Sequence, residues 1–460
     1  MHMAELKSEM EQMIEARRWN EIRDRAVEMP APELADLLLE LDKANRVLLF
    51  RILPRELAAE AFAYLESGPR DALLKELTDE ETRQLLSNLS PDDRTDVLAE
   101  LPGNVTRRLL NLLSPEDLRE AVYLLGYPEN SVGRLMTPDY VALRPEWTVV
   151  QSLEHIRTFA RSSETIDVVY VTQRGGLLIG TVDIRRLILA DPQSPVAEVM
   201  DEDVQSIQAD QDRETAVRTV QHYDLRVLPV VSTEGILVGI VTVDDVLDVA
   251  EEEATEDIQK MGGMEVLDAP YLQVGLLSMV RKRGGWLSAL FLGEMLTATV
   301  MSHFEQEIAA ALVLALFIPL IISSGGNSGS QAASLIIRSL ALQEVRLRDW
   351  FRVFRRELLS GLLLGTALGA IGFVRVFLWQ RMHLTDYGEH YVLVALTVWC
   401  SLIGVVLFGT IAGSMLPFLM RRFGFDPATS SAPFVATLVD VSGLIIYFTI
   451  AHVILRGTLL

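Results

Sequence analysis

The stretch from Ile308 to Ile337 contains thirty residues without one Asp, Glu, Lys or Arg. About 20 apolar residues are enough to cross the ~30 Å hydrocarbon core of a bilayer, so this stretch predicts a transmembrane segment. Its middle, Ser323 to Gln331, is rich in Ser, Gly and Asn. Glycine favours unwinding, and non-helical backbone at membrane depth persists only where protein buries it or where it lines a wet cavity. We therefore expect an interrupted helix here, and something polar within the bilayer.

Charge divides the chain into two parts near residue 270. The first part has 27 basic and 53 acidic residues, a net charge of −26, and the second has 14 and 10, a net charge of +4. The sequence therefore predicts a strongly acidic soluble region followed by a membrane domain. Binding to nucleic acid needs Lys/Arg patches that the acidic region lacks, whereas a surface of this charge attracts cations. The mixed-charge stretch from Met1 to Arg17 does not look like a secretory signal, and the single Cys400 permits no intramolecular disulfide.

Residues 1–134 are predicted to form a helical domain. Short runs of Leu at helical spacing each follow a helix-start signature. These signatures begin at Ala31, Leu53, Thr78, Ser90 and Ser114. In the last three of these signatures, Ser or Thr can cap the free N–H groups, and acidic residues favour the positive end of the helix dipole. Short helices at this spacing favour a superhelical stack of helical hairpins.

Residues 136–250 contain an internal duplication of alternating β-branched strands and amphipathic helices. The two copies match at Met136 and Met200, at Val168–Val171 and Val227–Val230, and at Gly180 and Gly239. The pattern resembles a tandem pair of cystathionine-β-synthase-type (CBS) domains, which we assign to residues 135–198 and 199–250. The resemblance implies an α/β fold for this part of the chain, and it is stronger in the second copy.

In the CBS family a Gly-x-x-Thr-x-x-Asp stretch can hold the ribose and phosphate of an adenosine nucleotide. The second copy matches it with Gly239, Thr242 and Asp245, whereas the first copy has Asp183 and Arg186 at the last two places. The resemblance thus implies at most one nucleotide site of this type, with ATP as a candidate ligand. Thr242 serves equally well as an ordinary strand-to-helix cap.

An acidic segment follows the duplication and leads into the membrane, and we assign residues 251–280 to a long linker helix. Asp244, Asp248, Glu252, Glu256 and Lys260 fall on one stripe of that helix at i+4 spacing. Like charges at this spacing destabilise a helix by a few tenths of a kcal/mol per pair, so a counter-ion would stabilise it.

The region 281–460 is predicted to be an all-α membrane domain of five spans. They lie at about 284–304, 308–343, 357–382, 391–420 and 427–455. Basic loops lie on one side, at 281–283, 338–356 and 421–422, and acidic loops on the other, at 305–307 and 386–389. By the positive-inside rule the amino end and the soluble domains are cytoplasmic and the carboxyl end is outside.

Two carboxylates lie well inside these spans, away from their ends. Asp440 shares one small, polar helix face with Pro433, Ala436, Thr437 and Gly443. A carboxylate near the bilayer centre costs several kcal/mol unless it faces water, a partner or an ion, so Asp440 is a functional candidate. Glu294 is a rival candidate. Its side chain could instead reach the membrane–water interface or pair with Arg375, which lies near the outer end of another helix.

Together these residues carry a specific resemblance to the MgtE family of magnesium channels. It rests on Pro319, on the Gly326-Asn327-x-Gly329-x-Gln331 motif, on the run Pro433–Asp440, and on the order of helical domain, paired CBS domains, acidic helix and five spans. The resemblance implies a homodimer in the lipid bilayer of a bacterial inner membrane, with a pore on the two-fold axis. It also implies Mg²⁺ as both substrate and regulator, with no nucleic-acid partner and no enzymatic activity.

The resemblance also implies roles for individual residues. In the pore, Asp440 matches the carboxylate that binds Mg²⁺, with Ala436 and Asn327 nearby. Asp426 matches an acidic residue that meets the linker, or plug, helix. The sensor candidates that would bind intracellular Mg²⁺ and close the pore are Asp244, Asp248, Glu252, Glu253, Glu256 and Asp257, with Asp92, Asp93 and Asp96 on the helical domain.

Elementary chemistry agrees with these roles. Mg²⁺ holds its hydration water tightly, so one carboxylate per subunit with several carbonyl or amide groups can bind the hydrated ion. Packed acidic residues repel each other when divalent ions are scarce, and bound Mg²⁺ would favour the closed arrangement. Three alternatives remain: a membrane metalloprotease, for which the His-Glu-x-x-His pattern is missing, an ion-coupled carrier, and a non-conducting membrane-anchored sensor.

Overall fold

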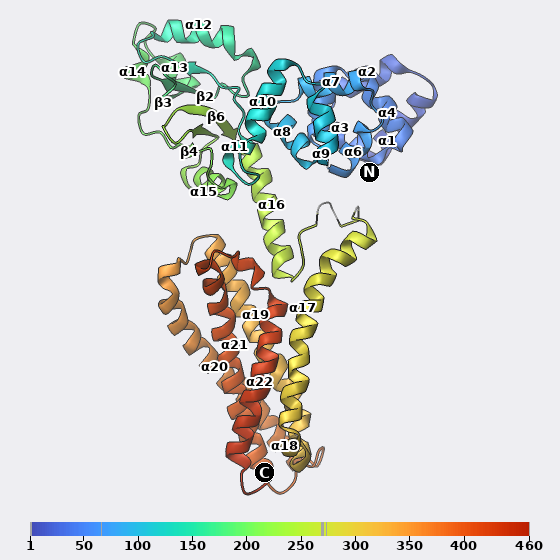
Figure 1. The fold of residues 1–460 in the computed structure, drawn as a ribbon, viewed down its shortest axis with the longest axis vertical. Coiled ribbons are helices and arrows are strands. Elements are labelled where there is room, and N and C mark those ends of the chain that lie inside the picture. Colours follow the sequence, from blue (N-terminus) through green and yellow to red (C-terminus); the bar gives the residue numbers. More distant parts are fainter. Residues whose placement is uncertain (1, 66, 268–270, 273, 460) are drawn as a thin grey trace. The chain divides into compact units, whose positions relative to one another are not determined.

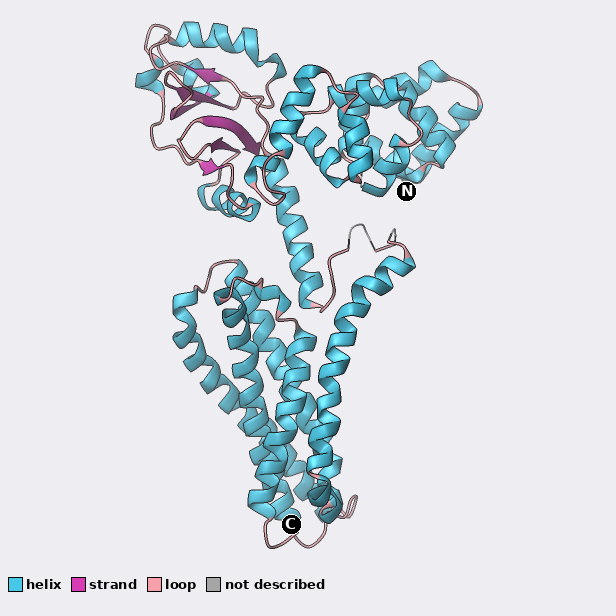
Figure 2. Ribbon diagram, in the orientation of Figure 1, coloured by secondary structure: helices cyan, strands magenta, loops and turns pink. Residues whose placement is uncertain are grey.

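The computed structural model describes residues 2–65, 67–267, 271–272 and 274–459 of the chain. It separates into two compact units, Met1–Glu253 and Ala254–Leu460. Strands occur only in the first unit, as Figure 2 shows, while the second is helical throughout its described secondary structure. This multidomain composition confirms the predicted fold class.

The first unit begins with a set of short helices (Figure 1). They are α1 (His2–Glu15), α2 (Trp19–Val27), α3 (Ala31–Glu40), α4 (Lys43–Ile52), α5 (Arg55–Ala63), α6 (Ser67–Leu74), α7 (Asp79–Asn88), α8 (Pro91–Glu100), α9 (Gly103–Leu110) and α10 (Pro115–Leu125). The predicted caps at Thr78, Ser90 and Ser114 are confirmed, because each side chain accepts a hydrogen bond from the backbone N–H three residues later. At α7, the Glu81 side chain accepts a hydrogen bond from the Thr78 N–H, and this second bond completes a capping box.

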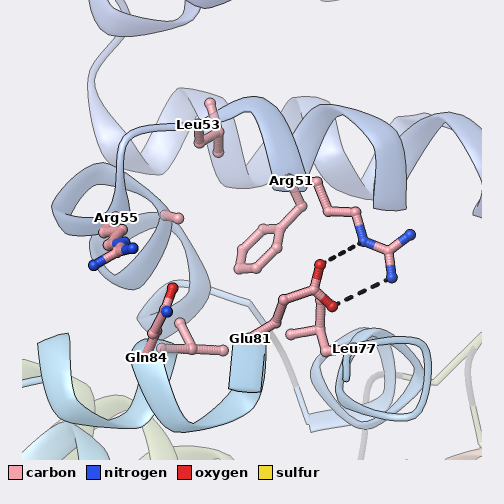
Figure 3. A pocket seen from close by; sticks show the side chains of 9 residues that line it. Arg51, Leu53, Arg55, Leu77, Glu81 and Gln84 are labelled. Atoms are coloured by element: carbon pink, nitrogen blue, oxygen red, sulfur yellow. Dashed lines mark hydrogen bonds and ion pairs between the residues drawn. The ribbon is translucent and has the colours of Figure 1, made fainter. Parts of the chain in front are cut away.

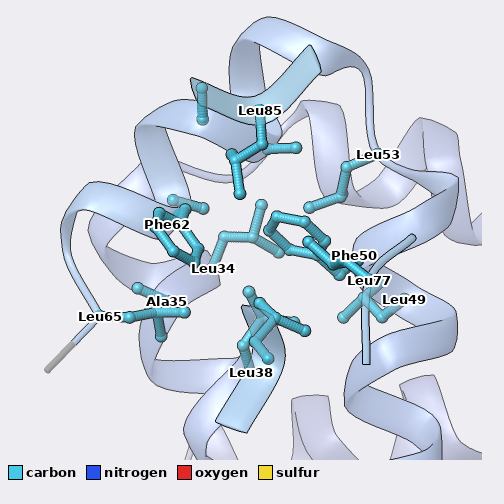
Figure 4. Packing of buried hydrophobic residues seen from close by; sticks show 14 of the residues in the cluster. Leu34, Ala35, Leu38, Leu49, Phe50, Leu53, Phe62, Leu65, Leu77 and Leu85 are labelled. Carbon is cyan, nitrogen blue, oxygen red and sulfur yellow. The ribbon is translucent and has the colours of Figure 1, made fainter. Parts of the chain in front are cut away.

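The helical domain encloses one hydrophobic core. Figure 4 shows Leu34, Leu38, Phe50, Phe62 and Leu85 converging from four different helices. Leu34, Leu38 and Phe62 are fully buried. The predicted Leu spacing therefore produces a continuous apolar interior, and the helices' polar faces stay in solvent.

The duplicated region folds as two three-stranded sheets of the same topology. Its helices are α11 (Val132–Leu135), α12 (Val149–Phe159), η1 (Ala160–Ser162), α13 (Ile184–Leu189), α14 (Val196–Val199) and α15 (Arg213–Tyr223). The strands are β1 (Ala142–Leu143), β2 (Val168–Thr172) and β3 (Leu178–Asp183) in the first copy, and β4 (Ile207–Gln208), β5 (Val227–Val231) and β6 (Leu237–Thr242) in the second. Val168 pairs with Asp183 in the first copy and Val227 pairs with Thr242 in the second, so the predicted repeat recurs in the strand register.

The acidic segment forms a single helix, α16 (Val243–Met261), which begins directly after β6. Gly263 adopts a left-handed φ of 71°, and the N–H groups of Gly262 and Gly263 bond to carbonyls of the last turn. This glycine cap was predicted, and it ends the helix in front of the membrane unit.

The second unit contains five helices long and apolar enough to span a membrane. The main helices are α17 (Leu276–His303), α19 (Ile318–Ala341), α20 (Trp350–Arg381), α21 (Tyr391–Arg422) and α22 (Ala432–Leu455). Short elements connect them: α18 (Glu305–Ala310), η2 (Leu312–Phe317), η3 (Leu347–Asp349) and η4 (Pro427–Thr429). α22 packs against α17, α19 and α21, so it occupies the centre of the unit.

The expected break within Ser323–Gln331 is wrong, because α19 is helical throughout this stretch. The interruption lies earlier, at Ala311, where φ is −128° and ψ is 72°, and the chain continues as the 3₁₀ segment η2. The hydroxyl of Tyr447 donates to the Leu314 carbonyl at 2.8 Å, and this bond supplies a partner to a carbonyl of the irregular segment.

The glycines of α19 serve close helix packing instead of unwinding. A Cβ atom placed on Gly413 would lie 2.1 Å from the carbonyl oxygen of Gly329, and one placed on Gly409 would lie 2.4 Å from the carbonyl oxygen of Gly325. The backbones of α19 and α21 therefore touch, an arrangement that small residues permit in membrane helices.

We expect the substitution Gly413→Ala to destabilise the membrane unit, since its methyl group would overlap the Gly329 carbonyl. Overpacking of this kind costs about 1–3 kcal/mol, which corresponds to a fall of roughly 2–12 °C in the melting temperature of a domain this size. Melting of the detergent-solubilised protein, followed by size-exclusion fluorescence, measures it. Gly284→Ala in α17 is the control, because nothing lies within 4 Å of its Cβ position. Equal melting temperatures for the two variants would contradict the packing argument.

Candidate functional site

The first candidate site lies on α22 around Asp440. This residue is partly buried, and a Cβ atom placed on Gly326 of α19 would lie 3.7 Å from its Oδ1 and 3.6 Å from the Cβ of Ala436. The predicted Asp440 and Ala436 thus lie together beside the Gly-rich part of α19. Because Gly326 has no side chain, the backbone of α19 lies close to the carboxylate.

A polar stripe on α19 runs beside this position. Ser323, Asn327 and Gln331 follow each other at i+4 spacing, and all three are exposed in the single chain. The Asn327 Nδ2 lies 3.5 Å from the Ser323 hydroxyl, at the limit of a hydrogen bond. Polar side chains at membrane depth face water or protein, since lipid offers them no partners. The stripe therefore marks a face that is wet or covered by another protein surface.

A second candidate site lies in the first unit, where the helical domain approaches the second CBS copy. Asp92 and Asp93 at the start of α8 interact electrostatically with Asp245 and Asp244 at the start of α16. Asp92 is 9% exposed, and its Oδ1 has no hydrogen-bond partner among the described residues. The structure thus brings predicted sensor residues from two domains to one place, although they are about 150 positions apart in sequence.

Burial and mutual repulsion raise the pKa values of Asp92, Asp93 and Asp245. Burial raises the pKa of Asp92 well above its usual range, and Asp245 and Asp93 add to the effect. Burial likewise raises the pKa of Asp245 to about 7, against hydrogen bonds from the Thr242 side chain and backbone. The pKa values of Asp93 and Asp248 are also raised, mainly by burial. Such groups bind a proton or a cation readily, because either removes the repulsion.

The sign of this shift predicts the pH dependence of the first unit. A carboxyl group with a raised folded-state pKa stabilises the fold below its unfolded pKa of about 4, and this stabilisation is lost as pH rises through the folded value, near 7 for Asp245. In EDTA, lowering the pH from 8 to 6 should therefore raise the melting temperature of the first unit by a few degrees. Calorimetry on the whole protein measures it.

Two controls accompany this prediction. Asp245→Asn should flatten the dependence, whereas Asp36→Asn, an exposed acidic residue of the same unit, should leave it unchanged. A melting temperature that falls steadily from pH 8 to pH 6 in the wild type would show that the repulsion is not there.

The remaining sensor candidates have partners within the chain. Arg213 contacts Glu252 at 2.7 Å and Glu253 at 2.9 Å. Asp96 pairs with Arg70 at 3.2 Å, and Asp257 also has an interaction partner. Within the second unit, Lys260 pairs with Glu256 and contacts Asp426 Oδ2 at 2.7 Å. Burial alone would lower the pKa of Lys260, but its hydrogen bonds to Asp426 and Glu256 outweigh burial and raise it.

The described residues contain no group of three or more His, Cys, Asp or Glu side chains placed to hold a metal ion. A site with three direct carboxylate or imidazole ligands is therefore absent from the described part of a single chain. The pairs that are present fit an ion that keeps most of its water, as Mg²⁺ does.

The predicted nucleotide residues Thr242 and Asp245 lie with Asp92 and Asp93. They are not among the residues that line the open cleft of the CBS pair. The Thr242 hydroxyl donates to Asp245 Oδ2 at 2.6 Å. The cleft of about 630 Å³ lies between the two copies, beside Asp183 and Arg185 of the first and Asp224 and Arg226 of the second. Its size suits a nucleotide.

A smaller cavity of about 100 Å³ lies in the helical domain between α4, α5 and α7. Figure 3 shows that Arg51 and Glu81 close one side of it with two contacts, of 2.9 and 3.3 Å. Apolar residues supply most of the remaining lining: Phe50, Leu53, Ala58, Leu77 and Leu85. The cavity is therefore a packing gap near the core and not a candidate site.

Three parts of the chain match known protein families. The family described as "Divalent cation transporter" matches residues 318–450, the "MgtE intracellular N domain" matches residues 29–130, and the CBS domain matches residues 196–252. The magnesium transporter MgtE of Thermus thermophilus is 44% identical over 338 residues, which cover 74% of this chain and 73% of that protein. The chain belongs to the MgtE family. MgtE of Enterococcus faecalis is 33% identical over 72% of this chain and 71% of its own length.

Two solved structures resemble the cytosolic part of this MgtE-family protein. The cytosolic domain of the Mg²⁺ channel MgtE in complex with ATP has a TM-score of 0.51 at 37% identity and covers 53% of this chain and 99% of its own. The soluble part of a magnesium transporter has a TM-score of 0.52 at 29% identity, with 55% and 99% covered. These relatives are transporters, so the chain is a membrane transporter of the MgtE family and not an enzyme, as expected.

Sequence reasoning missed two cationic residues and the cleft. Arg213 lies about 40 positions from the glutamates that it contacts, and Lys260 lies 166 positions from Asp426. Patterns of neighbouring residues do not predict pairs that are so far apart in sequence. Lys260 was visible as the last member of the acidic stripe, and its opposite charge was the one available signal.

Proposed function

We propose that this protein is a Mg²⁺-selective channel that imports magnesium into the cytoplasm and is closed when intracellular Mg²⁺ binds its acidic cytosolic domains. The observation that carries the proposal is the exposed polar stripe of α19 beside Asp440. In a lipid environment this face needs a second protein surface or water. A homodimer that joins two such faces would give each face a protein partner and would leave a hydrated path between them.

Within that path Asp440 is the residue that binds the ion. Two carboxylates, one from each subunit, give a charge of −2 while leaving room for water, and Ala436 and Asn327 add carbonyl and amide oxygens. Contacts through water are weak enough to let the ion leave, as conduction requires. The named activities of the MgtE relatives, magnesium transport and a Mg²⁺ channel, agree with this assignment.

The acidic cluster of Asp92, Asp93, Asp244 and Asp245 is the proposed sensor. A divalent ion bound there would join the helical domain to the start of α16, because the four side chains come from both. The helix continues to Lys260, which contacts Asp426 at the beginning of the last membrane segment. Occupancy of the sensor would thereby favour one position of α16, which closes the pore by population shift.

The protein is proposed to lie in a bacterial inner membrane with its soluble domains in the cytoplasm. The basic residues Arg281, Lys282 and Arg283 lie near the start of the first span, and Arg421 and Arg422 end the fourth. Glu305, Glu307 and the acidic loop 386–389 lie at the opposite ends of the helices. This distribution supports a cytoplasmic amino end and an external carboxyl end.

Flux through reconstituted protein tests the proposal. In proteoliposomes with low internal Mg²⁺, an inward Mg²⁺ gradient alone should fill the vesicles, and high Mg²⁺ on the cytoplasmic face should stop the flux. Flux that also requires a proton or sodium gradient would identify an ion-coupled carrier. Vesicles that stay empty under every gradient would identify a non-conducting sensor.

ATP is proposed to bind in the cleft between the two CBS copies. Arg185 and Arg226 are its cationic side chains, while five aspartates in the lining oppose a free nucleotide and favour its Mg²⁺ complex. We expect Arg185→Ala/Arg226→Ala to weaken ATP binding about tenfold or more, since each lost charge-assisted bond contributes about 1.5–3 kcal/mol. Calorimetric titration with MgATP measures it, and Arg174→Ala, in the exposed turn at the other end of β2 and β3, is the control. Equal affinities would place the nucleotide elsewhere.

A further inference from the structure

Glu294 is a second carboxylate well inside the membrane spans, on a helix that packs against the helix of Asp440. It lies on α17, and a Cβ atom placed on its neighbour Gly293 would be 3.0 Å from the Cγ2 of Thr437 on α22. Glu294 is therefore held at the level of the turn between Thr437 and Asp440. Its carboxylate acts electrostatically on that of Asp440.

The alternative partners of Glu294 do not account for it. The Arg375 guanidinium lies 5.6 Å from the centre of the Trp379 ring. Both residues are on α20, whereas Glu294 is on α17. Among the described residues the Glu294 carboxylate has no hydrogen bond or ion pair, and the side chain is exposed in the single chain. Glu294 also lies nine residues before the end of α17, too far along the helix for its short side chain to reach the interface.

Asp440 is thus flanked on two sides by features that suit an ion. Gly326 and the polar stripe lie on the α19 side, and Glu294 lies on the α17 side. Two neighbouring carboxylates repel each other in a medium of low dielectric constant, and a divalent cation relieves this repulsion more than a monovalent one.

We propose that Glu294 is a further ion-facing residue of the path and that it sets the affinity of the path for divalent cations. This inference rests on the proposed channel function and on Asp440 as its main ion-binding residue. Asp440 contacts the hydrated ion, while Glu294 adds a second negative charge from the same subunit. A pair of this kind selects by charge, so it favours divalent over monovalent ions.

The test is a Mg²⁺ titration of flux through the full-length protein in proteoliposomes. Glu294→Gln should raise the half-saturating Mg²⁺ concentration by roughly tenfold, because a unit charge within ~10 Å at an effective dielectric constant of ~20 changes a divalent affinity by at least that factor. Glu294→Asp should restore most of the affinity. Glu305→Gln removes one charge from the end of the span and should leave the titration unchanged.

The outcomes separate the possibilities. The inference is overturned if Glu294→Gln keeps the wild-type half-saturation, if only its maximal rate falls, or if Glu305→Gln shifts the titration equally. Should Glu294→Gln fail to fold, Glu294→Asp decides, since a small shift with a normal maximal rate is expected for it and a wild-type titration contradicts the inference. Asp440→Asn is run in parallel: if it conducts normally, the proposed function itself fails, whatever Glu294 does.

Discussion

Replacing Asp440 with asparagine is expected to reduce Mg²⁺ flux to the level of protein-free vesicles. Asparagine has nearly the same size and keeps an amide oxygen, so the packing of α22 against α19 should persist. It removes the negative charge, and Mg²⁺ then has no compensation for leaving bulk water at mid-membrane. The initial rate of gradient-driven Mg²⁺ entry, followed with an indicator dye, measures the effect.

The control for this prediction is Glu389→Gln, which removes one charge from the exposed outer loop of the same unit. It should conduct like the wild type, because the loop is outside the proposed path. A monodisperse Asp440→Asn protein that conducts at the wild-type rate would refute the assignment of the pore carboxylate. The same result would shift attention to Glu294, the other carboxylate at this depth.

Local sequence signals predicted a large part of this fold. The caps at Thr78, Ser90 and Ser114 depend on residues within one helical turn, so the sequence identified the starts of α7, α8 and α10. The duplicated strands followed from a repeat in the sequence, and the register of β2 with β3 and of β5 with β6 repeats it. Hydropathy likewise identified the five spans, although their ends differ by several residues.

The state of the Gly-rich stretch was not predictable from the same kind of signal. Glycine both weakens a helix and permits two helices to touch, and sequence alone does not say which effect applies. The answer depends on Gly409 and Gly413 of α21, about 85 positions away, whose backbones contact Gly325 and Gly329. The helix is retained because packing compensates for its weak propensity, and the break falls at Ala311, before the Gly-rich stretch begins.

The sensor candidates illustrate the same limit. All acidic residues of the α16 stripe looked alike in sequence, but the structure sorts them by their partners. Glu252 and Glu253 share Arg213, and Glu256 shares Lys260 with Asp426, whereas Asp245 interacts electrostatically with the buried Asp92. The pair without a cationic partner is therefore the better candidate for a regulatory ion.

The double substitution Asp92→Asn/Asp245→Asn is expected to remove most of the dependence of closure on internal Mg²⁺. The two carboxylates oppose the contact of the helical domain with α16 when the ion is absent, and they bind the ion when it is present. Neutral side chains remove both effects, so the relevant measure is the ratio of open probability at low and at high Mg²⁺. A coupling between binding and gating typically amounts to 1–3 kcal/mol, and its loss should reduce this ratio by roughly 5- to 150-fold.

Recordings from inside-out patches, with Mg²⁺ varied on the cytoplasmic face, measure this ratio directly. The matched control is Glu33→Gln/Asp36→Asn, which removes two exposed acidic residues from the same helical domain and should keep the wild-type inhibition curve. Neutralising Glu252 alone should have a smaller effect, because Arg213 already balances part of its charge. An inhibition curve for Asp92→Asn/Asp245→Asn that coincides with the wild type would show that the regulatory ion binds elsewhere. A curve shifted equally by the control would show that it responds only to total charge.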